Sequence, residues 1–177
     1  AIRRDEELDN LHSVYVDQWD WEKVITKEER TEEMLEETVR TIFKVIKHME
    51  HEIWYKYPHA VCHLANDVFF IDSQKLEDMY PDLSPKERED AITKEKKCVF
   101  IKRIAHALKR SGQPHDGRAP DYDDWNLNGD LFFWLPSLER ALEISSMGIR
   151  VDENSIVEQC RIRNAEERLK YPYHQMI

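Results

Sequence analysis

Glycine and cysteine are scarce in this chain, and each shortage excludes a class of site. The 177 residues include four glycines, and none of these lies in the glycine-rich loop that cradles phosphates in many nucleotide-binding proteins. The adjacent Ser145 and Ser146 also lack the glycine elbow expected around a serine nucleophile. The three cysteines, Cys62, Cys98 and Cys160, are odd in number and widely spaced. They argue against a disulfide framework or a structural zinc site, and for reduced thiols in the cytoplasm.

Long apolar runs and an excess of positive charge are missing as well. No apolar run approaches the ~20 residues that cross a bilayer, so we expect no membrane partner. The 26 lysines and arginines are outnumbered by 36 aspartates and glutamates, for a formal net charge of −10. The most basic stretch, residues 94–110, is interrupted by apolar residues 98–101, which argues against a nucleic-acid-binding surface. The length suits a single domain with a sizeable core.

Residues 12–22, HSVYVDQWDWE, can be read as a β-strand. Because successive side chains of a strand point to opposite faces, Gln18 and Asp20 would share one face. An amide that donates and accepts, beside a carboxylate that accepts, is suited to hold an amino group or another small polar ligand. A strand with one solvated polar edge explains the pattern equally well, so both interpretations stay open at this point.

The rest of the chain is predicted to mix helices and strands. Apolar residues at steps of three and four predict a long amphipathic helix. Ser84, Pro85 and Glu87 have the arrangement of a capping box at a helix start. Helices are predicted over residues 31–57, 73–79, 84–97, 104–109, 152–163 and 164–174, and strands over residues 67–72, 98–101, 129–134 and 142–151. This order predicts an α+β fold in which helices flank a mainly antiparallel sheet.

Two groups of carboxylates are candidates for binding a cation. Asp130 follows an Asn-Gly turn, and Glu143 lies on the next predicted strand, where it should share a face with Ser145 and Met147. Carboxylates on neighbouring strands suit Mg²⁺, although spacing alone favours ordinary ion pairs at the rim of the sheet. The loop RAPDYDDW, residues 118–125, holds three aspartates, which fits either a cationic ligand or a hydrated turn.

Five sequence blocks together resemble one enzyme family. They are HSVYVDQWDWE (12–22), YPDLSPKERE (80–89), RAPDYDDW (118–125), LNGD (127–130) and EISSMGIRVD (143–152). In these blocks the chain resembles the ammonia-dependent asparagine synthetases, or aspartate–ammonia ligases, which are related to the class II aspartyl- and asparaginyl-tRNA synthetases. The resemblance implies a class II synthetase-like catalytic domain over residues 1–177, and a homodimer. It also implies that ATP, with Mg²⁺, activates aspartate as β-aspartyl-AMP, and that ammonia then displaces AMP to give asparagine.

The resemblance also implies roles for residues on the amino-acid side of the site. Gln18 and Asp20 resemble the residues that surround the substrate aspartate, and Ser145 would line the same pocket. Asp123 would be both substrate-binding and catalytic, because its carboxylate would attract ammonium and could accept its proton.

On the nucleotide side, Arg3 resembles the catalytic arginine that contacts the α-phosphate of ATP and the reacting carboxylate. Asp130 and Glu143 would bind ATP and Mg²⁺. We expect these two carboxylates to face the same cavity as Gln18, Asp20, Asp123 and Ser145.

The chain also departs from the family pattern. The family continues upstream of Ala1 and beyond Ile177, with motifs for dimerisation, substrate binding and the ATP γ-phosphate, and it has a longer loop where Trp125 here meets Asn126 directly. We therefore expect this chain alone to be catalytically incomplete. An aspartyl-tRNA synthetase-like aminoacylation core and a non-catalytic binding module derived from a synthetase are the alternative interpretations.

Overall fold

The computed structural model describes residues 2–5, 7–9, 12–60, 64–172 and 174. These residues form an α+β fold around a four-stranded sheet in the order β1-β2-β3-β4. The elements are α1 (Glu32–Lys56), β1 (Phe69–Asp72), α2 (Ser73–Met79), α3 (Pro85–Lys96), β2 (Cys98–Lys102), β3 (Asp123–Leu135), β4 (Arg140–Arg150), α4 (Ser155–Ile162) and the 3-10 helix η1 (Glu166–Lys170). The described helices are too short or too polar to cross a membrane.

The sheet is mixed, so the prediction of a mainly antiparallel sheet is corrected. Strands β1 and β2 are parallel, whereas β2 pairs antiparallel with β3, and β3 with β4. Parallel neighbours need a crossover connection. Helices α2 and α3 supply it between β1 and β2, and the sequence order alone did not reveal that the two strands lie side by side.

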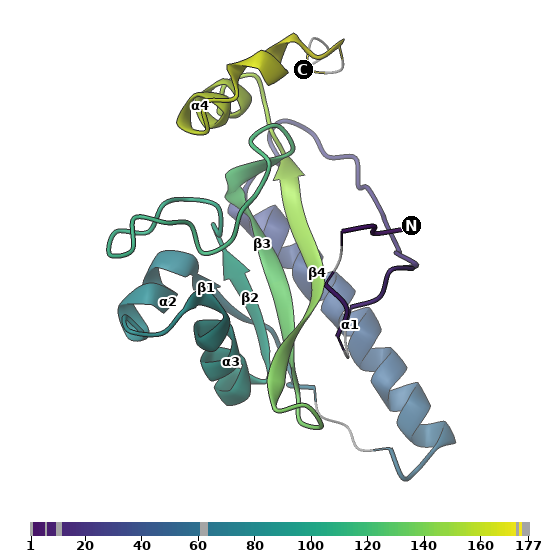
Figure 1. Cartoon of the computed structure of the whole chain (residues 1–177). Coiled ribbons are helices and arrows are strands. Elements are labelled where there is room, and N and C mark those ends of the chain that lie inside the picture. Colours follow the sequence, from purple (N-terminus) through teal and green to yellow (C-terminus); the bar gives the residue numbers. More distant parts are fainter. Residues whose placement is uncertain (1, 6, 10–11, 61–63, 173, 175–177) are drawn as a thin grey trace.

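The helices cover the two faces of the sheet differently (Figure 1). Helix α1 packs on one face, where Leu35, Val39 and Phe43 form a buried cluster with Leu131 and Phe133. Helices α2 and α3 pack on the opposite face through a second cluster that includes Leu76, Ile92, Ile101 and Phe132. We call these the α1 face and the α3 face.

Helix boundaries followed from local sequence signals in several places. The predicted helix over residues 31–57 is confirmed as α1, and the Thr31 side chain caps it by accepting from the Met34 N–H. The capping box of α3 is confirmed, because the Ser84 side chain accepts from the Glu87 N–H and the Glu87 side chain accepts from the Ser84 N–H. The prediction over residues 73–79 is confirmed by α2.

The predicted strand over residues 12–22 is wrong. In the described part of this segment the regular pairing is a single isolated bridge between Ile2 and Tyr15, and residues 16–26 are irregular. The segment runs past the β4 side of the sheet without joining it (Figure 1). A strand is stabilised by cross-strand hydrogen bonds and side-chain pairs, which the alternation of side chains does not supply. Gln18 and Asp20 therefore do not lie on the face of a strand.

Three other element predictions are corrected. Residues 104–109 form turns instead of a helix, because Arg103 has a φ of 57° and Ala107 bridges to Pro114. The predicted helix over residues 164–174 shortens to η1, with Asn164 at a φ of 52° before it and Pro172 after it. Strand β3 begins at Asp123 instead of residue 129, since its polar first half pairs with the end of β4 after a register shift.

Candidate active site

A buried ion pair lies in the middle of β3. Asp130 is 2% exposed, and the Nη2 of Arg118 donates to both of its carboxylate oxygens, at 2.6 and 2.5 Å. Arg118 comes from the irregular segment before β3, and its Nη1 also donates to Asp116 at 2.6 Å. A charge-assisted contact to both oxygens fixes the guanidinium in place, because each carboxylate oxygen accepts from the same cation.

Strand β4 brings two more polar groups to Asp130. The Ser146 Oγ lies 2.7 Å from an Asp130 oxygen and 3.2 Å from a Glu143 oxygen. Burial, and then the negative charge of Glu143, raise the pKa of Asp130 to about 6, although Arg118 and Ser146 act in the opposite direction. We call Arg118, Asp130, Glu143 and Ser146 the Asp130 cluster.

A β-bulge decides which β4 side chains reach this cluster. Ser145 pairs with Leu131, whereas Glu143 pairs with Phe132, so the register shifts by one residue between them. Directly paired residues share a face. Ser145 and Met147 therefore lie on the α1 face, and Glu143 lies on the α3 face with Asp130 and Ser146. The prediction that Glu143, Ser145 and Met147 share a face is wrong because a bulge is not visible in simple alternation.

A pocket of about 620 Å³ lies between β4, the start of α1 and the irregular segment before it. Three predicted substrate-binding residues line it: Asp20, Asp123 and Ser145. Its wall also contains the aromatic side chains of Trp19, Trp21 and Tyr122 and the aliphatic side chains of Leu35 and Ile149. The volume suits a small-molecule ligand, and its mixture of apolar walls and a few charges is typical of such sites.

Asp123 lines the pocket and is also close enough to the Asp130 cluster to be influenced by the charge of Arg118. Its carboxylate accepts from the Arg150 Nη1 at 2.7 Å, and Arg150 also stacks on the Tyr122 ring at 3.5 Å from its centroid. Burial raises the pKa of Asp123, whereas Arg150 and, more weakly, Arg118 lower it. Gly148 gives this carboxylate room, because a Cβ there would lie 2.7 Å from the Asp123 Cγ. Asp123 is therefore within the electrostatic reach of both arginines.

The six residues expected to face one cavity do not all line the same pocket in the structure. Asp20, Asp123 and Ser145 line the pocket, whereas Asp130 and Glu143 meet on the α3 face. Gln18, the sixth of these residues, is exposed and is not among the described residues that line the pocket. The same is true of Arg3, the predicted catalytic arginine. The pocket therefore brings together three of the six residues, and a cavity shared by all six stays a prediction for the whole protein. Residues 16–26, which include Gln18, do not pair with the sheet.

The three aspartates of the loop 118–125 each pair with a different cation. Asp121 accepts from Arg168 at 2.6 Å, Asp123 from Arg150, and Asp124 from Arg30 at 2.9 Å. Arginines of the chain itself therefore compensate these carboxylates, so the number of aspartates in the loop does not by itself indicate a cationic ligand. The Asp124 pair joins β3 to a residue just before α1, and the Asp121 pair joins the loop before β3 to η1. Of these three aspartates, Asp123 is the one that lines the pocket.

The described residues contain no group of three or more His, Cys, Asp or Glu side chains arranged to hold a metal ion. Both oxygens of Asp130 are already engaged by Arg118, whereas the Glu143 side chain is exposed. Glu143 is therefore better suited than Asp130 to act as a ligand of Mg²⁺. One carboxylate is sufficient for Mg²⁺ when substrate phosphates and water complete its coordination. Cys98 and Cys160 are free and buried, and Cys62 lies outside the described residues.

Sequence reasoning missed three members of the site: Arg118, Ser146 and Arg150. Each lies within a block that carried the family resemblance, and Arg118 opens the loop RAPDYDDW. An arginine in a loop rich in carboxylates was a usable signal, because such a loop needs compensation. Nothing in the pattern of residues indicates that the partner of Arg118 is Asp130, in the strand that follows the loop.

Comparison with known proteins gives a uniform result. The family model described as aspartate-ammonia ligase matches residues 1–177. Curated relatives named aspartate–ammonia ligase include those of Levilactobacillus brevis, at 67% identity, and Pediococcus pentosaceus, at 65%. In both, the match covers 100% of this chain and 52% of the relative. The relative from Lactiplantibacillus plantarum is 64% identical over the whole chain and 55% of its own length.

The chain thus spans about half the length of the curated relatives it matches. The match of the family model extends over every residue, and the five sequence blocks and the residues of the Asp130 cluster all lie within it. The chain belongs to the aspartate-ammonia ligase family.

Proposed function

We propose that the protein containing this chain ligates ammonia to L-aspartate with ATP, giving L-asparagine, AMP and pyrophosphate. The observation that carries the proposal is the position of Asp123. Its partly buried carboxylate lines a ligand-sized pocket and lies within the field of two arginines that belong to the family-like sequence blocks. The membership of the chain in the family makes this reaction the first candidate.

The proposed reaction has two steps. In the first, an oxygen of the aspartate β-carboxylate bonds to the α-phosphorus of ATP, and the bond to pyrophosphate breaks with its electron pair. In the second, the ammonia nitrogen bonds to the acyl carbon, and AMP leaves with the electrons of the acyl carbon–oxygen bond. The nitrogen then loses a proton to a base.

Asp123 is the proposed base. A carboxylate attracts ammonium and can take its proton once ammonia reacts, and an elevated pKa makes it a stronger base than an ordinary aspartate. Burial supplies that elevation here. Asp20 and Ser145 would bind the aspartate from the pocket wall. The roles of Gln18 and Arg3 are also part of the proposal, and they require these two side chains to approach the pocket in the whole protein.

The Asp130 cluster would serve the nucleotide. Arg118 supplies a positive charge that is already ordered by Asp130, and such preorganised charges stabilise the developing charge on phosphates. Glu143 would hold Mg²⁺, which would neutralise phosphate oxygens. Mg²⁺ would also relieve the repulsion by which Glu143 raises the pKa of Asp130.

The remaining elements of the proposal concern the whole protein. They are a class II synthetase-like catalytic fold, a homodimer and a cytoplasmic location. The free buried thiols of Cys98 and Cys160 are consistent with a reducing compartment. The molar mass of the full-length protein, measured by light scattering, tests whether it is a dimer.

One assay tests the proposed function. The full-length protein is supplied with ATP, aspartate and ammonia, with and without tRNA, and asparagine, AMP and aminoacyl-tRNA are measured. We expect asparagine and AMP in equal amounts, independent of tRNA. Formation of aspartyl-tRNA would instead favour an aminoacylation core, and the absence of ATP consumption would favour a binding module.

A further inference from the structure

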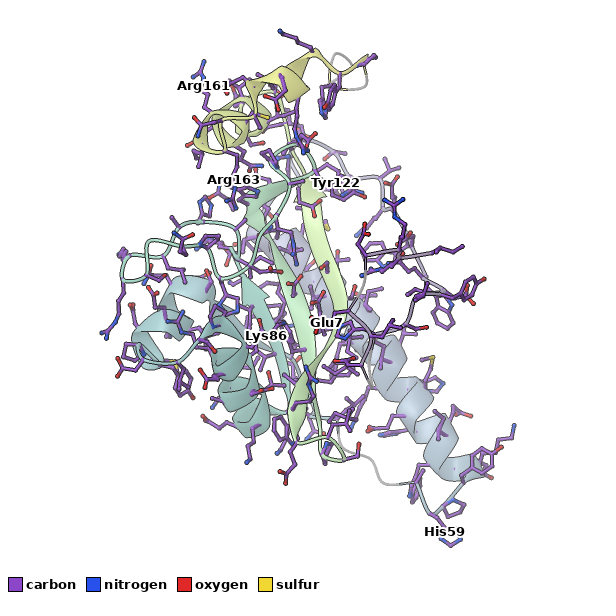
Figure 2. The ribbon with its side chains drawn as sticks, in the orientation of Figure 1. Glu7, His59, Lys86, Tyr122, Arg161 and Arg163 are labelled. Carbon is purple, nitrogen blue, oxygen red and sulfur yellow. The ribbon has the colours of Figure 1, made fainter. Side chains whose placement is uncertain are left out.

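Lys86, in the first turn of α3, faces the same side of the sheet as the Asp130 cluster. Its Nζ lies 5.9 Å from the centroid of the Phe132 ring. Phe132 pairs directly with Glu143 and is two residues from Asp130 on the same strand face. Figure 2 labels Lys86 between α3 and the strands. A cation from the helix therefore lies beside the exposed carboxylate of the cluster.

Two buried residues hold this lysine. The Lys86 Nζ donates to the Glu89 Oε2 at 2.9 Å, and the other oxygen of Glu89 lies 3.1 Å from the His115 Nε2. The side chains of Glu89 and His115 are 6% and 1% exposed. His115 belongs to the same irregular segment as Arg118, so Glu89 joins the lysine to the segment that carries the arginine.

Helix α3 is also fixed to β4 near the cluster. The Ala141 N–H donates to the Asp90 carboxylate at 2.6 Å, two residues before Glu143. Desolvation lowers the pKa of Lys86, but Glu89, Glu143 and Asp116 more than compensate, so its pKa is raised and the ammonium is charged at neutral pH. The hydrogen bond to Glu89 uses one of the three N–H donors of the ammonium group, and the side chain is 74% exposed. Donors therefore remain for a ligand.

We propose that Lys86 binds the β- and γ-phosphates of ATP on the α3 face, together with Arg118, and that Glu89 is the positioning residue for Lys86. This inference rests on the proposed function. A lysine beside an exposed carboxylate matches a Mg²⁺–nucleotide, because the ammonium binds phosphate oxygens while the carboxylate binds the metal. The phosphate chain would run from Asp123 and Arg118 toward Phe132, which places the reacting α-phosphate at the pocket end.

The test compares full-length variants in steady-state kinetics. Lys86→Ala should raise the KM for ATP about tenfold, which corresponds to about 1.4 kcal/mol, while the KM for aspartate stays the same. Lys86→Arg should recover most of the loss, and Glu89→Gln should show a smaller increase. The matched control is Lys94→Ala, which removes another lysine of α3 that lies over a β3 aromatic ring, 5.6 Å from the Trp134 centroid.

Equilibrium binding measured by calorimetry gives a second readout that does not require turnover. Lys86→Ala should weaken Mg²⁺–ATP and Mg²⁺–ADP about tenfold and leave AMP unchanged. If Lys86→Ala behaves as Lys94→Ala does, or weakens AMP equally, the inference is overturned even when the wild-type protein makes asparagine. Conversely, a wild-type protein without asparagine formation refutes the proposed function, while the ATP-binding comparison still decides the role of Lys86. Lys86→Gln, which keeps most of the side-chain stem, replaces the alanine variant if that variant does not fold.

Discussion

Arg118 and Asp130 form a contact between an irregular segment and the centre of a strand, in which one guanidinium nitrogen donates to both oxygens of a carboxylate that is 2% exposed. The contact holds the irregular segment over residues 111–122 against the α3 face of the sheet. Arg118 also compensates the negative charge of Asp130. Without it, Asp130 would be a buried carboxylate that is repelled by Glu143.

Removing the arginine should destabilise the fold. In Arg118→Ala, the free energy of unfolding should fall by about 3 kcal/mol at pH 7, because a buried charge loses its partner. Urea denaturation measures this change. Arg118→Lys should lose less, since the charge is kept. Equal losses for the two variants would mean that the charge of Arg118 is irrelevant to Asp130.

Asp130 should make the stability of the protein depend on pH. Its pKa of about 6 in the folded chain exceeds the ordinary value of 3.8, so the folded state binds the proton more tightly than the unfolded state does. The contribution of Asp130 to stability is therefore fully present below pH 4 and is lost as the pH rises through 6. Relative to Asp130→Asn, the wild-type protein should lose about 3 kcal/mol of stability across this window. Denaturation of both proteins at several pH values gives the difference, and a flat difference would refute the assignment.

The charge of Glu143 should contribute to this pH dependence. Glu143→Gln removes the second-largest cause of the elevation, so the midpoint of the pH-dependent stability difference should move to lower pH. The same denaturation series measures the midpoint. Glu139→Gln is the control, because it removes a negative charge from the exposed turn between β3 and β4. A shift of equal size in the control would indicate a general charge effect.

Two glycines should respond differently to alanine. In Gly148→Ala the new Cβ would lie 2.7 Å from the Asp123 Cγ, so Asp123 should leave Arg150 and asparagine formation by the full-length protein should fall at least tenfold while the protein stays folded. In Gly129→Ala the Cβ would lie 2.3 Å from the backbone oxygen of Ile101, so the sheet itself should be destabilised. Activity and thermal denaturation of both variants separate the two effects. An active Gly148→Ala protein would contradict the proposed role of Asp123.

Local sequence signals predicted much of the fold. The apolar spacing that defines α1 and the Ser84 capping box that starts α3 act within a few residues of each other, and both were recognised. Pairing between strands was harder, because it depends on partners far apart in sequence. The parallel pairing of β1 with β2, and the bulge that separates the side chains of Glu143 and Ser145, are therefore absent from the pattern of residues.

The candidate site was predicted in part for the same reason. The carboxylate-rich loop was visible in the sequence, but the choice of Asp123 within it came from the family resemblance. Asp130 and Glu143 were identified from their positions on neighbouring strands, and the structure places these two close enough for the charge of Glu143 to raise the pKa of Asp130. Gln18 was predicted from alternation in a segment that does not pair with the sheet in the described chain. The arginines that compensate the carboxylates come from other elements, so a one-dimensional pattern could not assign each to its partner.

The most direct test of the proposed reaction is exchange of radiolabelled pyrophosphate into ATP, catalysed by the full-length protein without ammonia. Formation of β-aspartyl-AMP is reversible, so the label should enter ATP when aspartate is present and should not enter when it is omitted. Exchange without aspartate, an absolute requirement for ammonia, or release of ADP and phosphate in place of AMP and pyrophosphate would each contradict activation of aspartate at this site.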